Sequence, residues 1–119
     1  MDRLITRNNF YVNHSLTPIV YGNNQQKTDT IISAISEISG LSIETLKSPS
    51  RKREAVEWRH IICYICYANA YGSLAFIGLN MGGRDHSTVI NGRNTVQSLL
   101  DTNDKDFAQK WAVCKQLVR

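Results

Sequence analysis

The chain has 119 residues, 42% of them hydrophobic and 20% charged, which is typical of one compact domain with a core of its own. Fourteen Lys and Arg residues against ten Asp and Glu residues give a net charge of +4, which is compatible with a nucleic-acid partner but does not indicate one by itself. No segment reaches the roughly 18–20 apolar residues of a membrane span, and the N-terminus has no signal-peptide core, so we expect a cytoplasmic protein with no membrane contact.

Residues 1–26 read as an N-terminal extension of uncertain structure. Asn, Gln, Pro18 and Gly22 are typical of loops, whereas Phe10, Tyr11 and Val12 are too apolar for a plain linker. The extension packs on the domain, binds a protein partner, or orders only on binding, and the sequence leaves these alternatives open. We place the domain at residues 27–119.

The first helix is predicted to begin at a cap formed by Thr28 or Asp29 and to stop at Gly40, with isoleucines repeating along it at helical spacing. Ser42 then caps a short helix, and Ser48-Pro49-Ser50 breaks the chain.

Three cations, Arg51, Lys52 and Arg53, follow this break and precede a long helix. Crowded like charges are costly unless water or an anion screens them. The run is therefore either a solvated turn or a basic loop that contacts nucleic acid.

A mainly apolar helix over residues 54–71 is predicted to be the central one, with Gly72 as its stop. It contains Cys63 and Cys66 in a C-x-x-C spacing. A zinc site would need a second pair of ligands, and a redox motif would need a preceding strand, so we interpret the two cysteines as core residues.

A short helix over residues 74–80, capped by Ser73, leads to Gly82 and Gly83, which take positive φ readily and suit a tight turn. Asp85 can cap the helix that follows, which is predicted to extend to about residue 100. Helix, glycine turn and helix in this order are typical of a helix-turn-helix.

Gly92 lies inside that long helix, where it costs about 1 kcal/mol relative to Ala, which indicates close approach of another helix. Residues 101–104 break the pattern and cap a last helix carrying Phe107, Trp111, Cys114 and Val118 on one face. With no strand predicted after residue 27, the fold class is all-α, a bundle of about six helices.

Enzymatic chemistry finds little support in the sequence. No G-x-x-x-x-G-K-[ST] motif is present, and His14, His60 and His86 lack metal-ligand spacing. Asp85-His86-Ser87 contains the residue types of a triad, but neighbours at a helix start point in different directions. We therefore predict no enzyme, no cofactor and no metal.

The polar start of the residue 85–100 helix suits DNA. Its unpaired N–H groups favour a phosphate, Arg84 suits a phosphate or guanine, and Asp85 can accept from a cytosine amino group. His86, Ser87 and Thr88 can reach base edges. The alternative is that Asp85 and Ser87 only cap the helix and His86 only satisfies backbone groups; both roles are compatible.

The stretch Gly82-Gly83-Arg84-Asp85-His86-Ser87-Thr88-Val89 resembles the signature of the DNA-binding C-terminal domain (domain IV) of the bacterial replication initiator DnaA. The resemblance covers about residues 27–118. It implies a Trp-repressor-like helix-turn-helix of bacterial or phage origin, and double-stranded DNA, such as a DnaA-box-like site, as the partner.

The resemblance also implies which residues contact DNA. The signature residues would contact the major groove and the adjacent backbone: Arg84, Asp85, His86, Ser87 and Thr88. Arg51, Lys52 and Arg53 would form the basic loop that inserts an arginine into the minor groove, and Ser73 and Leu74 would contact the DNA backbone. Arg59 matches a further basic position of the family and is expected to bind DNA as well. Glu57-Trp58 and Tyr67 depart from the more basic family pattern, so one or two phosphate contacts are expected to be missing.

The resulting prediction is sequence-specific binding of double-stranded DNA in replication-origin or transcription regulation, without the initiator's ATPase module. The alternative is a protein-interaction module on a DNA-binding-like scaffold, recruited through residues 1–26.

Overall fold

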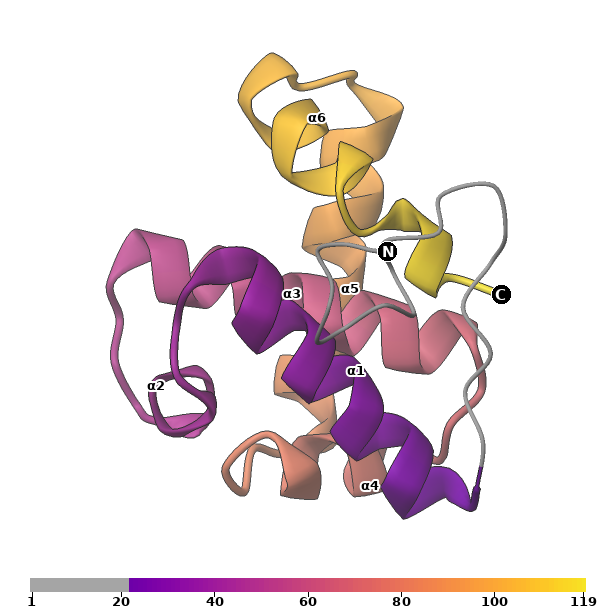
Figure 1. Ribbon diagram of the computed structural model, residues 1–119. Coiled ribbons are helices and arrows are strands. Elements are labelled where there is room, and N and C mark those ends of the chain that lie inside the picture. The colour runs from indigo at the N-terminus through magenta and orange to yellow at the C-terminus, as the bar shows by residue number, and fades with distance from the viewer. Residues whose placement is uncertain (1–21) are drawn as a thin grey trace, which may run out of the picture.

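Six α-helices and a final 3₁₀ turn make up residues 22–119, the part of the chain that the computed structural model describes (Figure 1). No strand occurs in this part, so the all-α prediction is confirmed. Most of the N-terminal extension, and with it the predicted protein-partner segment, lies outside the described residues. None of the described helices is long and apolar enough to cross a membrane.

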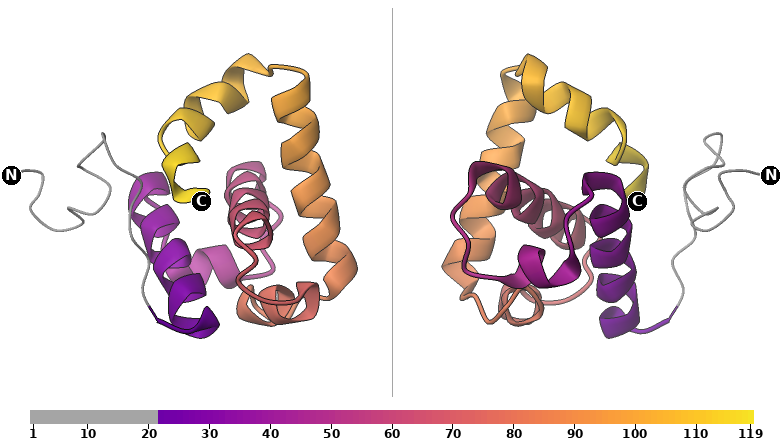
Figure 2. Two further views of the ribbon diagram at one scale, coloured as in Figure 1. Left: turned by 90° about the vertical axis from the view of Figure 1, so that its right-hand side faces the viewer. Right: turned by 60° about the vertical axis from the view of Figure 1, so that its left-hand side comes forward.

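Helix α3 (Arg53–Ala68) is the centre of the bundle. Figure 2 (left) shows it nearly end-on, with α1 (Asn24–Ser39), α4 (Leu74–Asn80), α5 (His86–Asp101) and α6 (Lys105–Ala112) around it. Its Ile61, Ile62 and Ile65 are fully buried, as an all-round apolar helix requires. The central position predicted for this helix is therefore confirmed.

The first helix begins earlier than predicted. Asn23 is the N-cap of α1, and its side chain accepts from the Gln26 backbone N–H at 2.9 Å while the Gln26 side chain accepts from the Asn23 N–H at 2.9 Å. This capping box satisfies two helix-end donors, so the prediction of a cap at Thr28 or Asp29 is wrong. Thr28 is a buried residue inside the helix, which ends as predicted at Gly40, with φ at 79°.

Two further helix ends differ from prediction. Helix α3 stops at Ala68 rather than at residue 71, because Ala70 takes a left-handed backbone with φ at 57°. Helix α6 stops at Ala112, and a 3₁₀ turn, η2 (Lys115–Leu117), continues the chain. Cys114 and Val118 therefore pack on the core from outside α6.

Three further caps are as predicted, and the cap of α6 lies within the predicted stretch 101–104. Ser42 caps α2 (Ile43–Lys47), Ser73 caps α4, Asp85 caps α5 and Asp104 caps α6, each by accepting from a backbone N–H three residues on. Cys63, Cys66 and Cys114 are free and buried, and burial raises the pKa of the Cys63 thiol to about 12. The interpretation of the C-x-x-C pair as core residues is confirmed.

Candidate nucleic-acid interface

The turn between α4 and α5 is built around a glycine inside α4. The Arg84 N–H donates to the Gly78 carbonyl at 2.8 Å, which folds the chain back onto α4. A Cβ at Gly78 would lie 2.0 Å from the Arg84 carbonyl oxygen. Gly82 and Gly83 have φ of 85° and 79°, as the turn prediction requires. Only glycine at position 78 permits this approach, which fixes the angle between the two helices.

The N-terminus of α5 presents exposed polar side chains at positions 85–88. One oxygen of Asp85, Oδ1, accepts from the Thr88 N–H at 3.0 Å, the Thr88 hydroxyl at 3.0 Å and the Ser87 hydroxyl at 2.8 Å. These bonds, the backbone one first, hold the pKa of the Asp85 carboxyl below its usual value. Asp85 is therefore an ionised cap that orders the hydroxyls of Ser87 and Thr88 around it.

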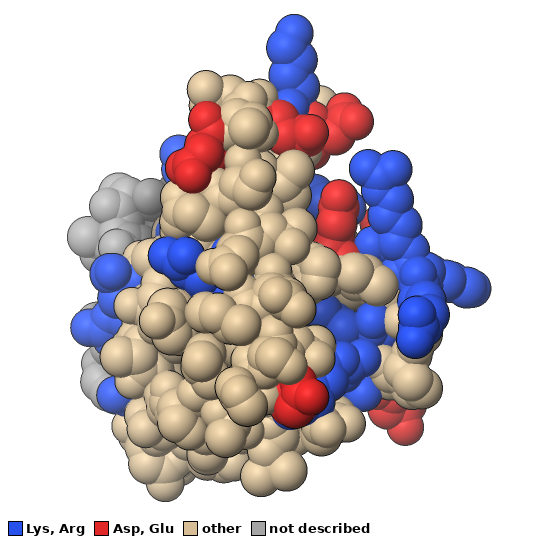
Figure 3. Space-filling view, turned by 180° about the vertical axis from the view of Figure 1, so that it is seen from behind, with Lys and Arg blue, Asp and Glu red and all other residues tan. Residues whose placement is uncertain are grey.

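The basic run lies where α2 leads into α3. Arg51 and Lys52 are exposed, and neither forms an ion pair with any residue in the described range. Arg53 is the first residue of α3 and lies 3.9 Å from the Glu57 carboxylate. Figure 3 shows Lys and Arg side chains gathered on the side of the molecule where α2 and the start of α3 lie.

Arg59 is buried, only 5% exposed, and its guanidinium faces the loop rather than solvent. Its nitrogens donate to the carbonyls of Leu46 at 2.7 Å, Ser50 at 2.6 Å and Thr45 at 3.1 Å. Burial, and then the nearby Arg84 charge, lower the pKa of this guanidinium. The guanidinium of Arg59, a residue predicted to bind DNA, thus donates its hydrogen bonds to protein carbonyls in the free protein.

Arg84 is half-buried, and its guanidinium likewise donates to main-chain carbonyls of the protein. Its guanidinium donates to the Ser48 carbonyl at 2.5 Å, to the Lys47 carbonyl at 3.4 Å and to the Met81 carbonyl. The predicted major-groove contact at this position would require Arg84 to leave these partners.

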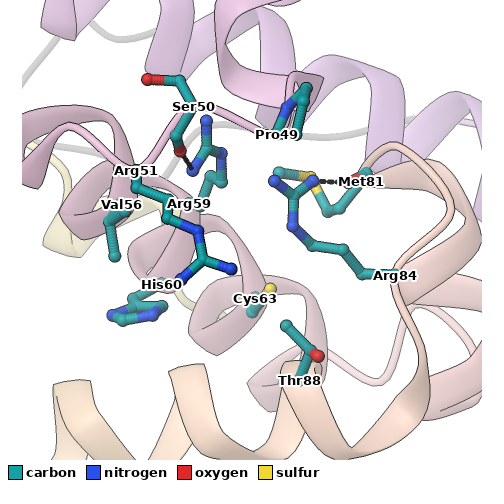
Figure 4. A pocket seen from close by; sticks show the side chains of 10 residues that line it. All are labelled: Pro49, Ser50, Arg51, Val56, Arg59, His60, Cys63, Met81, Arg84 and Thr88. Atoms are coloured by element: carbon teal, nitrogen blue, oxygen red, sulfur yellow. Dashed lines mark hydrogen bonds between the residues drawn. The ribbon is translucent and has the colours of Figure 1, made fainter.

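A cleft of about 320 Å³ separates the basic loop from α5 (Figure 4). Arg51, Arg59 and Arg84 line it together with His60 and Thr88, and no Asp or Glu is among its lining residues. Cys63 and Met81 form its apolar floor. The surface between the two predicted DNA-contacting segments is therefore lined by three arginines and by no acidic side chain.

The other predicted contacts are more peripheral. Ser73 is exposed, but its hydroxyl accepts from the Phe76 N–H at 3.0 Å as the cap of α4, and Leu74 is half-buried against the core. Neither residue lines the cleft. The structure thus brings the loop and the α5 N-terminus together and leaves Ser73 and Leu74 at the far end of α4.

The positions that depart from the family pattern have partners within the protein. Lys110 of α6 binds the Glu57 carboxylate and lies 5.4 Å from the centre of the Trp58 ring. The Arg93 guanidinium lies 5.7 Å from the centre of the Tyr67 ring. Glu57 and Trp58 therefore attach α6 to α3, and the negative charge of Glu57 is balanced within the protein.

Gly78 is the functional residue that sequence reasoning missed. A glycine inside a seven-residue helix is a signal of close packing, like Gly92, which the sequence did identify. A Cβ at Gly92 would lie 2.9 Å from the His60 ring, so the expected close approach of another helix there is confirmed.

The described residues contain no group of three or more His, Cys, Asp or Glu side chains placed to hold a metal ion.

Comparison with known proteins then gives the family context of this geometry. Residues 28–96 match the family described as "Bacterial dnaA protein helix-turn-helix". The chain is 33% identical over 97 residues to the chromosomal replication initiator protein DnaA of Chlorobaculum tepidum, covering 81% of this chain and 20% of that protein. Over 79 residues it is 38% identical to the DnaA protein of Flavobacterium psychrophilum, covering 66% of this chain and 16% of the relative.

A third relative, the DnaA protein of Picosynechococcus sp., is 39% identical over 77 residues, with coverage of 65% and 17%. The chain thus spans about a fifth or less of the curated relatives that it matches. No solved structure matched.

Proposed function

Because the chain belongs to the bacterial DnaA helix-turn-helix family, a family of DNA-binding domains, we propose that it binds double-stranded DNA at a short specific sequence and contacts both grooves. The observation that carries this proposal is the cationic cleft, which separates an exposed basic loop from the exposed polar N-terminus of α5. The proposal concerns this chain alone; the replication role of its relatives is a further step.

In the major groove, the first turn of α5 reads base edges. A B-DNA major groove admits one α-helix, and the side chains of the first helical turn reach deepest. The second carboxylate oxygen of Asp85, which is not used in the cap, accepts from a cytosine amino group. The Thr88 methyl contacts a thymine methyl, and His86 adds an exposed imidazole.

In the minor groove, Arg51 supplies the inserted cation, with Lys52 and Arg53 on the flanking phosphates. Arginine is favoured in narrow minor grooves because the potential there is most negative. Arg51 is exposed and forms no ion pair with any described residue, so its insertion breaks no salt bridge within residues 22–119. A backbone phosphate between the two grooves then lies over the cleft.

This function places the protein, of bacterial or phage origin, on the nucleoid of a bacterial cell, in the cytoplasm. It regulates transcription or acts at a replication origin by occupying DnaA-box-like sites.

A binding titration tests the proposal. Duplexes with a DnaA-box-like site and a scrambled sequence of equal composition are compared by fluorescence anisotropy at several salt concentrations. We expect tighter binding to the box duplex, by a factor of about 10³ at physiological salt, and a salt slope that reflects several phosphate contacts. Equal, weak binding to both duplexes would contradict the specific part of the proposal.

A further inference from the structure

Two arginines from distant parts of the chain bind the same six-residue segment. The carbonyls of Thr45, Leu46, Lys47, Ser48 and Ser50 all accept from Arg59 or Arg84. This segment is the end of α2 and the first half of the loop that carries the cations of residues 51–53. We call Arg59 and Arg84 together the arginine clamp.

The chemistry of the segment explains why arginine suits it. The last carbonyls of a helix lack partners within the helix and form its negative end. Guanidinium carries five N–H donors in a planar fork, so one side chain can satisfy several carbonyls that face different directions. No Asp or Glu lines the cleft beside the clamp, so carbonyl dipoles are the counter-charge for both cations.

Each clamp residue also belongs to an element that positions DNA contacts. Arg84 immediately precedes the α5 cap Asp85, and its backbone N–H is bonded to Gly78, so its Cα is fixed to the helix-turn-helix. Arg59 lies in the middle of the central helix α3. The loop is therefore held against both elements from one side.

We propose that Arg84 and Arg59 are positioning residues that fix the basic loop relative to α5, so that the two DNA-contacting segments engage DNA as one unit. This inference rests on the proposed function for its DNA readout. In it Arg84 acts through the loop and makes no base contact. Without the clamp, the carbonyls of residues 45–48 and 50 lose their hydrogen bonds to Arg59 and Arg84, and Arg51 meets DNA from a mobile loop.

The first test needs no DNA. Trypsin cleaves after Arg51, Lys52 and Arg53, and cleavage of a folded protein reports local opening. Arg84→Lys keeps the charge and the number of tryptic sites but loses the guanidinium fork. The matched control is Arg93→Lys, another half-buried arginine, which lies in α5 and has Tyr67 and Asn94 as partners.

We expect Arg84→Lys to raise the initial cleavage rate at residues 51–53 by about fivefold or more while other sites keep their rates, because only the loop opens. Arg93→Lys should leave the rate at residues 51–53 unchanged. A rise of equal size at all sites, or no rise, would overturn the inference. Arg84→Gln, which also removes the charge, is run beside it, and circular dichroism verifies that each variant folds.

The second test is a double-mutant cycle with the box duplex. If Arg51→Ala weakens binding by about tenfold in the wild-type background, the loss should shrink to about twofold in the Arg84→Lys background and stay tenfold in the Arg93→Lys background. Equal losses in all backgrounds would mean that the DNA contact of Arg51 does not depend on Arg84, and the inference would be wrong.

The two tests separate the claims. If the wild-type protein binds no duplex, the proposed function fails, and the proteolysis result still decides whether the clamp holds the loop. If the protein binds DNA but Arg51→Ala weakens binding equally in every background, the proposed function stands and the proposed coupling between Arg51 and Arg84 fails.

Discussion

At the scale of single residues, Asp85 shows how one side chain can serve structure and recognition together. Its Oδ1 accepts three hydrogen bonds, two of them from the hydroxyls of Ser87 and Thr88. Each of these hydroxyls donates its only hydrogen to Asp85, so it can act toward DNA only as a hydrogen-bond acceptor. The first turn of α5 is therefore rich in acceptors and has His86 as its exposed side-chain donor.

Thr88 is expected to contribute mainly to specificity. Thr88→Ala removes the methyl and the hydroxyl but keeps the backbone N–H that bonds Asp85, so α5 retains its cap. We expect the ratio of box to scrambled affinity to fall by about tenfold, since one good base contact discriminates by roughly 1–3 kcal/mol. Thr88→Val is the control for the methyl. If Thr88→Ala discriminates like wild type in the anisotropy titration, α5 does not read bases through this residue.

Arg51 is expected to contribute to affinity on every sequence. Arg51→Ala should weaken binding to the box and the scrambled duplex alike and lower the slope of log K against log salt by about one. Lys105→Ala, an exposed cation at the start of α6, removes the same charge far from the cleft. An unchanged slope for Arg51→Ala, or an equal change for Lys105→Ala, would remove the loop from the interface.

His60 makes stability depend on pH. Burial lowers the pKa of its imidazole, with the charge of Arg59 acting in the same direction and that of Glu57 against them. The unfolded chain therefore binds a proton that the folded protein does not. The free energy of unfolding is therefore at its full value above the unfolded pKa of about 6.5, and it decreases as pH falls toward the lower pKa of the folded protein. Thermal melts from pH 7.5 to 5 should show a smaller fall in Tm for His60→Gln than for wild type; parallel curves would exclude His60 as the cause.

At the scale of elements, the α4–α5 pair depends on contacts between backbones. Gly78→Ala would drive a Cβ into the Arg84 carbonyl, an atom that cannot move without shifting the turn. We expect a loss of about 2 kcal/mol or more in the free energy of unfolding, by the mechanism of overpacking. Gly83→Ala is the comparison, because its Cβ would meet nothing within 4 Å and only its positive φ is strained, which costs about 1–2 kcal/mol. Urea denaturation measures both; a smaller loss for Gly78→Ala than for Gly83→Ala would contradict this account.

The elements also show what can be predicted from a sequence. The caps at Ser42, Ser73, Asp85 and Asp104 were predictable because a cap bond spans three residues. The start of α1 was not, because Asn23 lies in a run of Asn and Gln that is equally typical of a loop.

For the residues predicted to bind DNA, features set by nearby residues could be predicted from the sequence, and contacts with distant residues could not. Exposure of the basic loop and of the α5 N-terminus could be predicted from their polarity and position. The occupation of Arg59 and Arg84 could not, since their carbonyl partners in the loop lie 9 to 37 residues away in sequence. Only the packed structure shows that these two cations face protein carbonyls.

At the scale of the whole molecule, α6 and the C-terminal turn lie away from the cleft and serve stability. Trp111 packs edge-on against Tyr64 of α3, with ring centres 5.4 Å apart, and Asn69 donates to the Leu117 carbonyl at 2.9 Å. We expect Trp111→Ala to cost about 2–3 kcal/mol of stability, since the ring is partly buried on the core. In the same variant the ratio of box to scrambled affinity should be unchanged at a temperature where it is fully folded. A change in that ratio would show that α6 influences recognition.

The arginine clamp has a consequence for how such a protein can evolve. Its partners are main-chain carbonyls, which every amino acid carries, so substitutions at residues 45, 47, 48 and 50 leave the acceptors in place, whereas Leu46 is also a buried core residue. The loop can accumulate side-chain changes over generations, and exchange one DNA preference for another, without losing its location. Insertions and deletions in the loop are expected to be selected against, because a change of length moves the carbonyls away from the two fixed guanidinium groups.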